Sequence, residues 1–138
     1  MNATLMLLAD YANTTADNRL NVMGIFTQIR AMNYPAVHPQ MYVVAQLSAS
    51  PAEYGRKFKL GIKLLDADAS ELLNFDSEVE VPRGENGQPS IMNFVLPLVS
   101  VVFGKPGSYQ FSLLVNEDEK ATYSIEAILI SPSLPSSE

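Results

Sequence analysis

The segment 56–81 constrains the fold of this chain more than any other part of its sequence. Two runs in which apolar and polar residues alternate, 56–66 and 71–81, flank an Asp-rich turn. If Asp66 pairs with Glu71, one register gathers the apolar residues on one face and sets lysine opposite glutamate on the other. The inward pairs are then Leu64–Leu73, Ile62–Phe75, Leu60–Ser77 and Phe58–Val79, and the outward pairs are Lys63–Asn74, Gly61–Asp76, Lys59–Glu78 and Lys57–Glu80. A shift of one residue would break both patterns, so the sequence predicts a β-hairpin with this register.

Alternating or apolar runs recur along the whole chain, separated by clusters of Gly, Pro, Asn and Asp. The predicted strands are 4–12, 20–30, 41–49, 56–66, 71–81, 90–103, 109–115 and 121–130. The prolines of 33–40 exclude that link from a central strand. We therefore expect an all-β fold, an eight-stranded antiparallel β-sandwich of immunoglobulin-like or jelly-roll-like type. It would form a single domain over residues 1–130, followed by a polar Ser/Pro tail at 131–138.

Composition and charge exclude several function classes. The net charge of −6 argues against nucleic acid and against an anionic membrane surface as partners. No apolar run approaches the roughly 20 residues of a membrane-spanning helix. The chain has no cysteine, which excludes disulfides and thiolate chemistry. The first residues lack the basic region of a secretory signal, so a cytoplasmic location is the expectation.

The sequence gives little support to a catalytic role. The only histidine, His38, lies in a proline-flanked link, and no neighbouring residue is marked as its orienting partner. The chain contains neither a G-x-S-x-G nucleophile motif nor a glycine-rich phosphate loop. We expect a protein that is not an enzyme and needs no cofactor.

Calcium is the one metal that the sequence brings into consideration. Asp66, Asp68 and Glu71 place three carboxylates at one hairpin tip, and calcium prefers clustered oxygen ligands. The EF-hand pattern fails, however, because its sixth position requires glycine and is Glu71 here. Aspartate side chains also stabilise turns by binding nearby backbone amides. We expect a structural turn and no metal site, and folding that does not depend on calcium.

The run 90–103 is apolar on both faces. Alternation places Met92, Phe94, Leu96, Leu98 and Val102 on one face and Ile91, Val95, Val99 and Val101 on the other. A two-sheet core covers only one of these faces. Pro97 favours an edge position, because proline donates no hydrogen bond to a neighbouring strand. Two explanations remain open: an interface through Phe94, Leu96, Leu98 and Val102, or a cover supplied by residues 33–40 or by the tail.

Four stretches carry a family resemblance: LLADYANTTADNRLNVMGIFTQI, PAVHPQMYVVAQL, KLLDADASELL and KPGSYQFSLLVN. Through them, the chain up to about residue 130 resembles a bacterial family of short proteins known as a domain of unknown function. The resemblance implies a β-sandwich and supplies no catalytic residues. Ala69 departs from the pattern, since a glycine is expected at this hairpin turn.

Taken with the low charged fraction of 17%, these features favour a non-catalytic interaction module that binds a protein or a small ligand. The alternative is a self-assembling subunit of a homo-oligomer or a larger assembly. The expected partner is a second copy of the chain or another protein.

Overall fold

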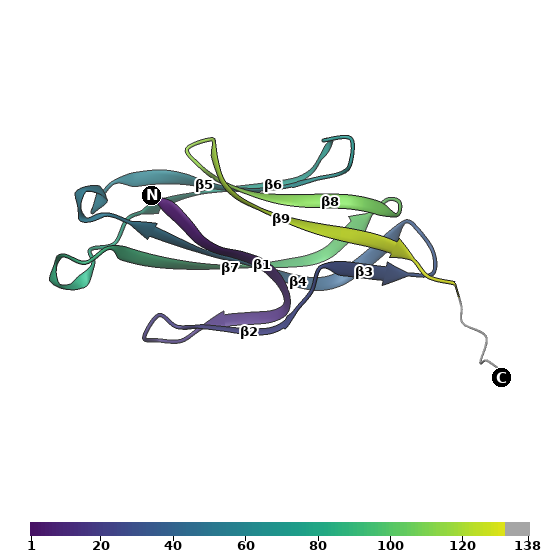
Figure 1. The fold of residues 1–138 in the computed structure, drawn as a ribbon, viewed down its shortest axis with the longest axis horizontal. Coiled ribbons are helices and arrows are strands. Elements are labelled where there is room, and N and C mark those ends of the chain that lie inside the picture. The colour runs from purple at the N-terminus through teal and green to yellow at the C-terminus, as the bar shows by residue number, and fades with distance from the viewer. Residues whose placement is uncertain (132–138) are drawn as a thin grey trace.

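A computed structural model describes residues 1–131 of the chain (Figure 1). Within those residues it contains nine strands and two short 3-10 helices. In chain order they are β1 (Asn2–Thr14), β2 (Leu20–Ile25), β3 (Gln28–Ala31), β4 (Ala36–Ala49), η1 (Pro51–Glu53), β5 (Lys57–Leu65), β6 (Glu71–Glu80), η2 (Glu85–Gly87), β7 (Ser90–Phe103), β8 (Gly107–Val115) and β9 (Asp118–Leu129). Apart from Ser131, the predicted Ser/Pro tail lies outside the described residues.

The strands form two sheets, in the orders β2-β1-β4-β7 and β3-β9-β8-β5-β6. Every neighbouring pair is antiparallel except β3 with β9, which is parallel. The prediction of an all-β fold is confirmed, but the prediction of eight antiparallel strands is wrong. There are nine strands among residues 1–131, and the five-stranded sheet is mixed. The arrangement is therefore sandwich-like without being strictly immunoglobulin-like or jelly-roll-like.

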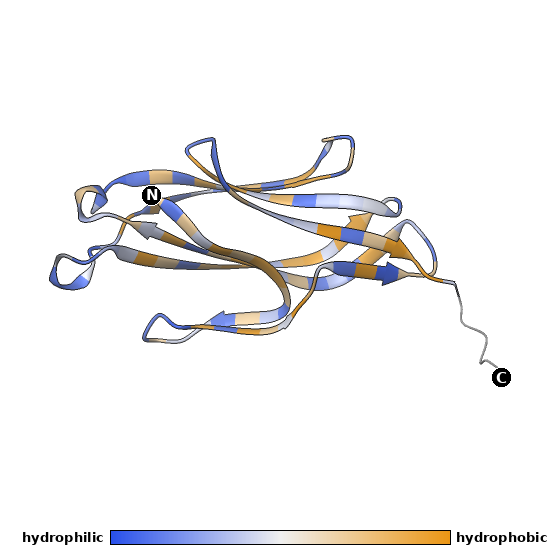
Figure 2. Ribbon diagram, viewed as in Figure 1, coloured by the Kyte–Doolittle hydropathy of each residue, from blue (hydrophilic) through white to orange (hydrophobic). Residues whose placement is uncertain are grey.

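The core lies between the two sheets, because strands of both carry apolar side chains at alternate positions. On β4, Met41 and Val43 are buried; on the opposite sheet, Leu64 and Phe111 are fully buried. Figure 2 shows that apolar residues line the strands and polar residues collect at the hairpin turns. Each such side chain contributes about 1.5–3 kcal/mol when removed from water, so this core dominates the stability.

The predicted hairpin register is confirmed from Lys57 opposite Glu80 to Leu64 opposite Leu73. The tip differs from the prediction, because the register shifts after Leu64 and Glu71 faces Leu65 rather than Asp66. Ala69 takes a left-handed conformation with φ 63°, the role expected of a turn glycine. The side chain of Asp66 stabilises this turn by accepting hydrogen bonds from the amides of Asp68 and Ser70.

The predicted strand 20–30 is two strands, because the chain crosses from one sheet to the other near Phe26. The amide of Phe26 donates to the Leu8 carbonyl of the first sheet (3.2 Å). Its carbonyl accepts a hydrogen bond from the Tyr123 hydroxyl of the second sheet (2.8 Å). These two bonds fix the crossing, after which β3 joins β9.

Residues 36–40 belong to β4, so the exclusion of the link 33–40 from a central strand is wrong for this part. The pairing of β1 with β4 ends at Ala9 opposite Tyr42. From residue 36 to 40, β7 is the one strand of the described part of the chain that pairs with β4. Pro39 is tolerated there because this end of a central strand is locally an edge.

The β1–β2 hairpin forms a partial third layer. β1 curves, and its second half returns with β2 along the outer face of the four-stranded sheet (Figure 1). A second buried cluster lies beneath it, in which Ala12 packs with Leu7, Ala9 and Val44. Val95 of β7 is partly buried against the same cluster. The hairpin therefore covers part of the outward apolar face of β7, a role that the sequence had left to residues 33–40, the tail or another subunit.

The turn between β4 and β5 contains a pH-sensitive contact. The carboxylate of Glu53 accepts a hydrogen bond from the Ser50 amide (3.0 Å) and pairs with the terminal ammonium of Met1 (3.3 Å). The backbone hydrogen bond from Ser50 is the main cause that lowers the pKa of Glu53 below its usual value. The contact therefore stabilises the fold fully above the ordinary glutamate pKa, and less as the pH falls through the lowered value.

We expect Glu53→Gln to be less stable than the wild type by about 1 kcal/mol near neutral pH. This difference should shrink on acidification, because the wild type loses the charge that the variant never had. Urea unfolding of both proteins between neutral and acidic pH measures it. A difference that stays constant, or grows as the pH falls, would contradict the assigned role of Glu53.

Candidate functional site

The candidate site is a groove between β6 and β7, which are the last strands of the two sheets. The loop 81–89 joins them directly, so both free edges lie on the same side of the molecule. We call this surface the β6–β7 groove. Its side chains are Leu73, Phe75 and Val79 of β6 and Phe94, Leu96 and Leu98 of β7.

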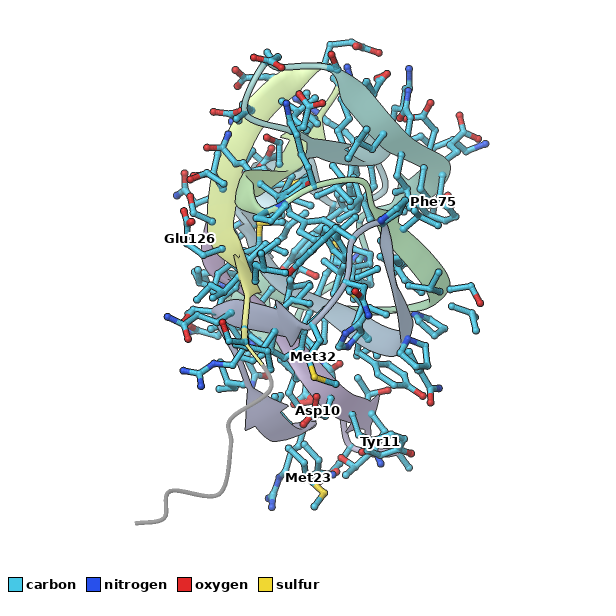
Figure 3. The ribbon with its side chains drawn as sticks, turned by 90° about the vertical axis from the view of Figure 1, so that its right-hand side faces the viewer. Asp10, Tyr11, Met23, Met32, Phe75 and Glu126 are labelled. Atoms are coloured by element: carbon cyan, nitrogen blue, oxygen red, sulfur yellow. The ribbon has the colours of Figure 1, made fainter. Side chains whose placement is uncertain are left out.

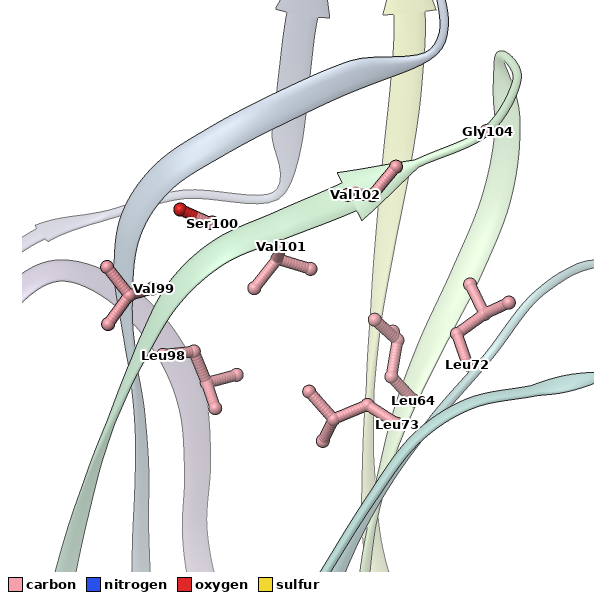
Figure 4. Close-up of a pocket in the computed structure, with 9 residues that line it drawn as sticks. All are labelled: Leu64, Leu72, Leu73, Leu98, Val99, Ser100, Val101, Val102 and Gly104. Atoms are coloured by element: carbon pink, nitrogen blue, oxygen red, sulfur yellow. The ribbon is translucent and has the colours of Figure 1, made fainter.

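Three hollows follow one another along the groove. The first, of about 460 Å³, lies between Leu73 and Leu98 and is shown in Figure 4. The second, of about 190 Å³, lies between Phe75 and Leu96. The third, of about 800 Å³, extends from Phe94 over the loop that follows β6. The first two form a mainly apolar channel beside β6, whereas polar side chains such as Glu80, Arg83 and Asn93 line much of the third.

Phe75 is the most exposed aromatic side chain of the groove. It pairs with Ile62 as predicted, and both line the same hollow on the inner side of the sheet. Yet Phe75 is 40% exposed, whereas Ile62 is buried. The reason is the edge position of β6, because no strand within residues 1–131 pairs with its outer side.

The predicted interface residues of β7 differ in their exposure. Phe94, Leu96 and Leu98 are half-buried and pack against the core from the groove. Val102 is 52% exposed and lines the first hollow together with Leu98, while its neighbour Val101 is buried in the core. The change in alternation falls at Ser100, whose backbone is left-handed (φ 54°), while the pairing of β7 with β4 keeps the same register on both sides of it. The predicted alternation, which put Val101 on the outer face, is therefore wrong beyond Leu98. The role of Phe94, Leu96, Leu98 and Val102 as an interface stays a prediction.

The outer face of β6 forms an acidic rim beside the groove. It carries Asp76, Glu78 and Glu80 at alternate positions, with Glu71 at the start of the strand. Lys59 of β5 lies opposite Glu78 as predicted. However, its ammonium group contacts Asp76 (3.7 Å) and Glu117 (2.5 Å). Among residues 1–131, no ion pair within 4.0 Å includes Glu78 or Glu80.

The contact of Lys59 with Glu117 is reflected in the titration of both groups. Their side-chain hydrogen bond raises the pKa of Lys59 and lowers the pKa of Glu117. Lys59 is thus held in its charged form at the turn between β8 and β9, away from Glu78.

The other residues that the sequence brought forward lie apart from the groove. His38 is on β4, and its ring lies 5.6 Å from that of Phe26. One carboxylate oxygen of Asp66 accepts hydrogen bonds from the amides of Asp68 and Ser70, both at 2.9 Å. Over residues 1–131, no three carboxylate or histidine side chains are placed to hold a metal ion together. In the same range, no helix is long and apolar enough to cross a membrane.

Sequence reasoning missed the groove side of β6. It placed Leu73, Phe75 and Val79 beneath the sheet but gave no sign that β6 is an edge strand. Edge position depends on strand order, which long-range pairing determines. A usable signal was present in the run ELLNFDSEVE, where acidic residues alternate with apolar ones and no basic residue occurs.

Comparison with known proteins places the chain in a family. A family model described as a family of unknown function, DUF6941, matches residues 4–128. The chain belongs to DUF6941. This agrees with the resemblance seen in the sequence, and the family description assigns no activity to this DUF6941 protein.

Two further comparisons add no function to the DUF6941 protein. The search of curated proteins found no match. Among solved structures, the chain is similar to the Pseudomonas fluorescens alkylpurine DNA glycosylase AlkC bound to DNA containing an abasic site analog, with a TM-score of 0.46 and 10% sequence identity. The match covers 88% of this chain but only 30% of the glycosylase chain.

Proposed function

We propose that this protein is a non-catalytic interaction module that binds another protein along the β6–β7 groove. The single observation that carries the proposal is the open apolar channel between two edge strands. A groove of this kind exposes apolar surface to water, and such surface on a soluble protein marks contact sites. The partner would cover Phe75, Leu96 and Leu98 and remove their exposed area from water.

The positions of the polar residues support a binding role over a catalytic one. His38 packs on an aromatic ring, and the carboxylate of Asp66 is occupied with its own turn. The side chains that line the central part of the groove are mostly apolar, with Ser77 among them. A surface of this composition suits recognition through burial, with few groups placed for proton transfer.

The second candidate is self-assembly, and the β2 strand favours it. Met23 is 67% and Ile25 59% exposed on β2, which is the other edge strand of the four-stranded sheet. If β2 contacts a second copy, sedimentation velocity over a micromolar dilution series will show a dimer. The interaction module predicts a monomer over the same range, because its partner is a different protein.

The groove itself is tested with the neutral apolar dye Nile red. We expect the wild type to bind the dye with increased fluorescence, and Phe75→Asp to lose most of this increase, because a charge in the channel excludes an apolar ligand. Met23→Asp is the matched control: it adds the same charge at an exposed apolar residue remote from Phe75 (Figure 3). An equal loss in both variants, or in neither, would contradict the proposal.

A further inference from the structure

We infer that the partner segment in the β6–β7 groove is an extended strand in which apolar residues alternate with lysine or arginine, and that it pairs with the free edge of β6. This inference rests on the proposed function and names the chemistry of its partner. Three features of the groove lead to it: the state of its two edges, its apolar floor and its acidic rim.

Of the two edges, β6 is the one open to an added strand. Among residues 1–131 it pairs with β5 alone, so within this range one side of its backbone has no neighbouring strand, and β6 contains no proline. A strand added there gains main-chain hydrogen bonds, as in other cases of β-augmentation.

The edge of β7 is obstructed at several points. Pro97 lacks an amide donor, and the backbone of Ser100 is left-handed (φ 54°) within the strand. Near its start, the side-chain amide of Asn18 donates to the Ile91 carbonyl (3.1 Å), and that of Asn93 donates to the Asn18 carbonyl (3.0 Å). The tip of the β1–β2 hairpin thus lies against β7, which leaves β6 as the favoured edge.

The floor of the groove determines every second residue of the added strand. Side chains alternate between the two faces of a strand, so alternate residues of the partner would point into the channel. There they would meet Phe75, Phe94 and Leu96, which are all apolar and none fully buried. Valine, isoleucine, leucine or phenylalanine at these positions would cover the part of the core that β6 leaves exposed.

The acidic rim determines the intervening residues. Side chains on the outer face of the added strand would lie beside Asp76, Glu78 and Glu80. Opposite charges in such cross-strand pairs are favourable, and like charges are unfavourable. From residue 66 to 82 the chain has six acidic residues and no basic one. On the neighbouring strand Lys59 pairs with Asp76, but within residues 1–131 no ion pair includes Glu78 or Glu80. A second copy of β6 would bring acid against acid, which argues for a basic partner.

The test uses fluorescence anisotropy with the full-length protein and labelled nine-residue peptides. The probe alternates lysine with valine; one control replaces every lysine by glutamate, and another keeps the composition but groups the lysines in one block. We expect binding of the alternating basic peptide, weaker binding of the block peptide and least binding of the acidic one. Raising the salt concentration should weaken the binding of the basic peptide, since interactions between exposed charges are screened.

Paired variants locate the contact. Glu78→Gln/Glu80→Gln should lower the affinity for the basic peptide about fivefold, because two exposed ion pairs with the peptide are lost. Phe75→Ser should weaken it about tenfold through loss of an apolar anchor. The matched control Glu119→Gln/Glu126→Gln removes the same charge from β9, three strands away in the sheet, and should leave the affinity unchanged. Circular dichroism establishes that each variant is folded.

The outcomes separate this inference from the proposed function. If the acidic peptide binds as well as the basic one, or the β9 control weakens binding as much as the β6 variant, the inference is overturned. If no alternating peptide binds while Phe75→Asp still abolishes Nile red binding, the groove remains a contact site and its assigned occupant is wrong. If Phe75→Asp also leaves Nile red binding unchanged, both the proposed function and this inference are wrong.

Discussion

Phe111→Ala is expected to lower the free energy of unfolding by about 4 kcal/mol, the typical loss for a fully buried aromatic residue. Phe111 lies at the centre of β8, is completely buried and belongs to the core shared by both sheets. Removing its ring deletes contacts with both sheets and leaves a cavity that the surrounding strands only partly fill. Urea unfolding followed by circular dichroism measures the difference.

Phe75→Ala supplies the matched comparison for this variant. It removes the same ring from an edge position where the side chain is 40% exposed. Phe75→Ala should therefore lower the free energy of unfolding by well under half as much as Phe111→Ala does. Equal losses would contradict the view that β6 is open on the groove side and that the core lies nearer β8.

Val44→Asp is expected to destabilise the protein by about 3 kcal/mol or more, because it places a carboxylate in a dry apolar site. Val44 is fully buried on the outer face of β4, where the β1–β2 hairpin covers it together with Leu7 and Ala9. The expected result is partial detachment of the hairpin, detectable as faster hydrogen exchange of β2 amides and a lower unfolding midpoint.

Val99→Asp is the control on β7 for the same change of residue. Val99 is 72% exposed, so its replacement should alter stability by no more than about 0.5 kcal/mol. If Val44→Asp were as harmless as Val99→Asp, the β1–β2 hairpin would not cover this face, and the third layer described here would be wrong.

The sequence predicted the hairpin of β5 and β6 well because two independent patterns agreed on one register. Apolar residues on one face and opposed charges on the other both require Ile62 opposite Phe75 and Lys59 opposite Glu78. Local information was sufficient there. It was also sufficient for the all-β class, since turn residues separate short alternating runs throughout the chain.

Three features escaped prediction because they depend on contacts distant in sequence. Ser100 of β7 takes a left-handed conformation although it is not a glycine, so the sequence does not mark it. Pro39 is accommodated in β4 only because β1 has already ended its pairing. The β1–β2 hairpin covers Val95, and no local sequence pattern predicts the curvature that brings the hairpin there.

The candidate site, too, could be predicted only in part from the sequence. Phe94, Leu96 and Leu98 were identified because β7 is conspicuously apolar, and they do line the groove. On β6, Leu73, Phe75 and Val79 were predicted to point inward, but the sequence did not indicate that they form one side of a binding site. That step requires the strand order, in which β6 and β7 end their sheets on the same side.

The most direct test of the central claim is a titration of the nitrogen-15-labelled protein with the alternating lysine–valine peptide, followed by amide chemical shifts. The account predicts that shifts change along β6, from Leu72 to Glu80, and on β7 around Phe94 and Leu96. The amides of the β1–β2 hairpin, including Met23, should remain unchanged. Changes confined to the β1–β2 hairpin, with β6 unaffected, would contradict the assignment of the β6–β7 groove as the binding surface.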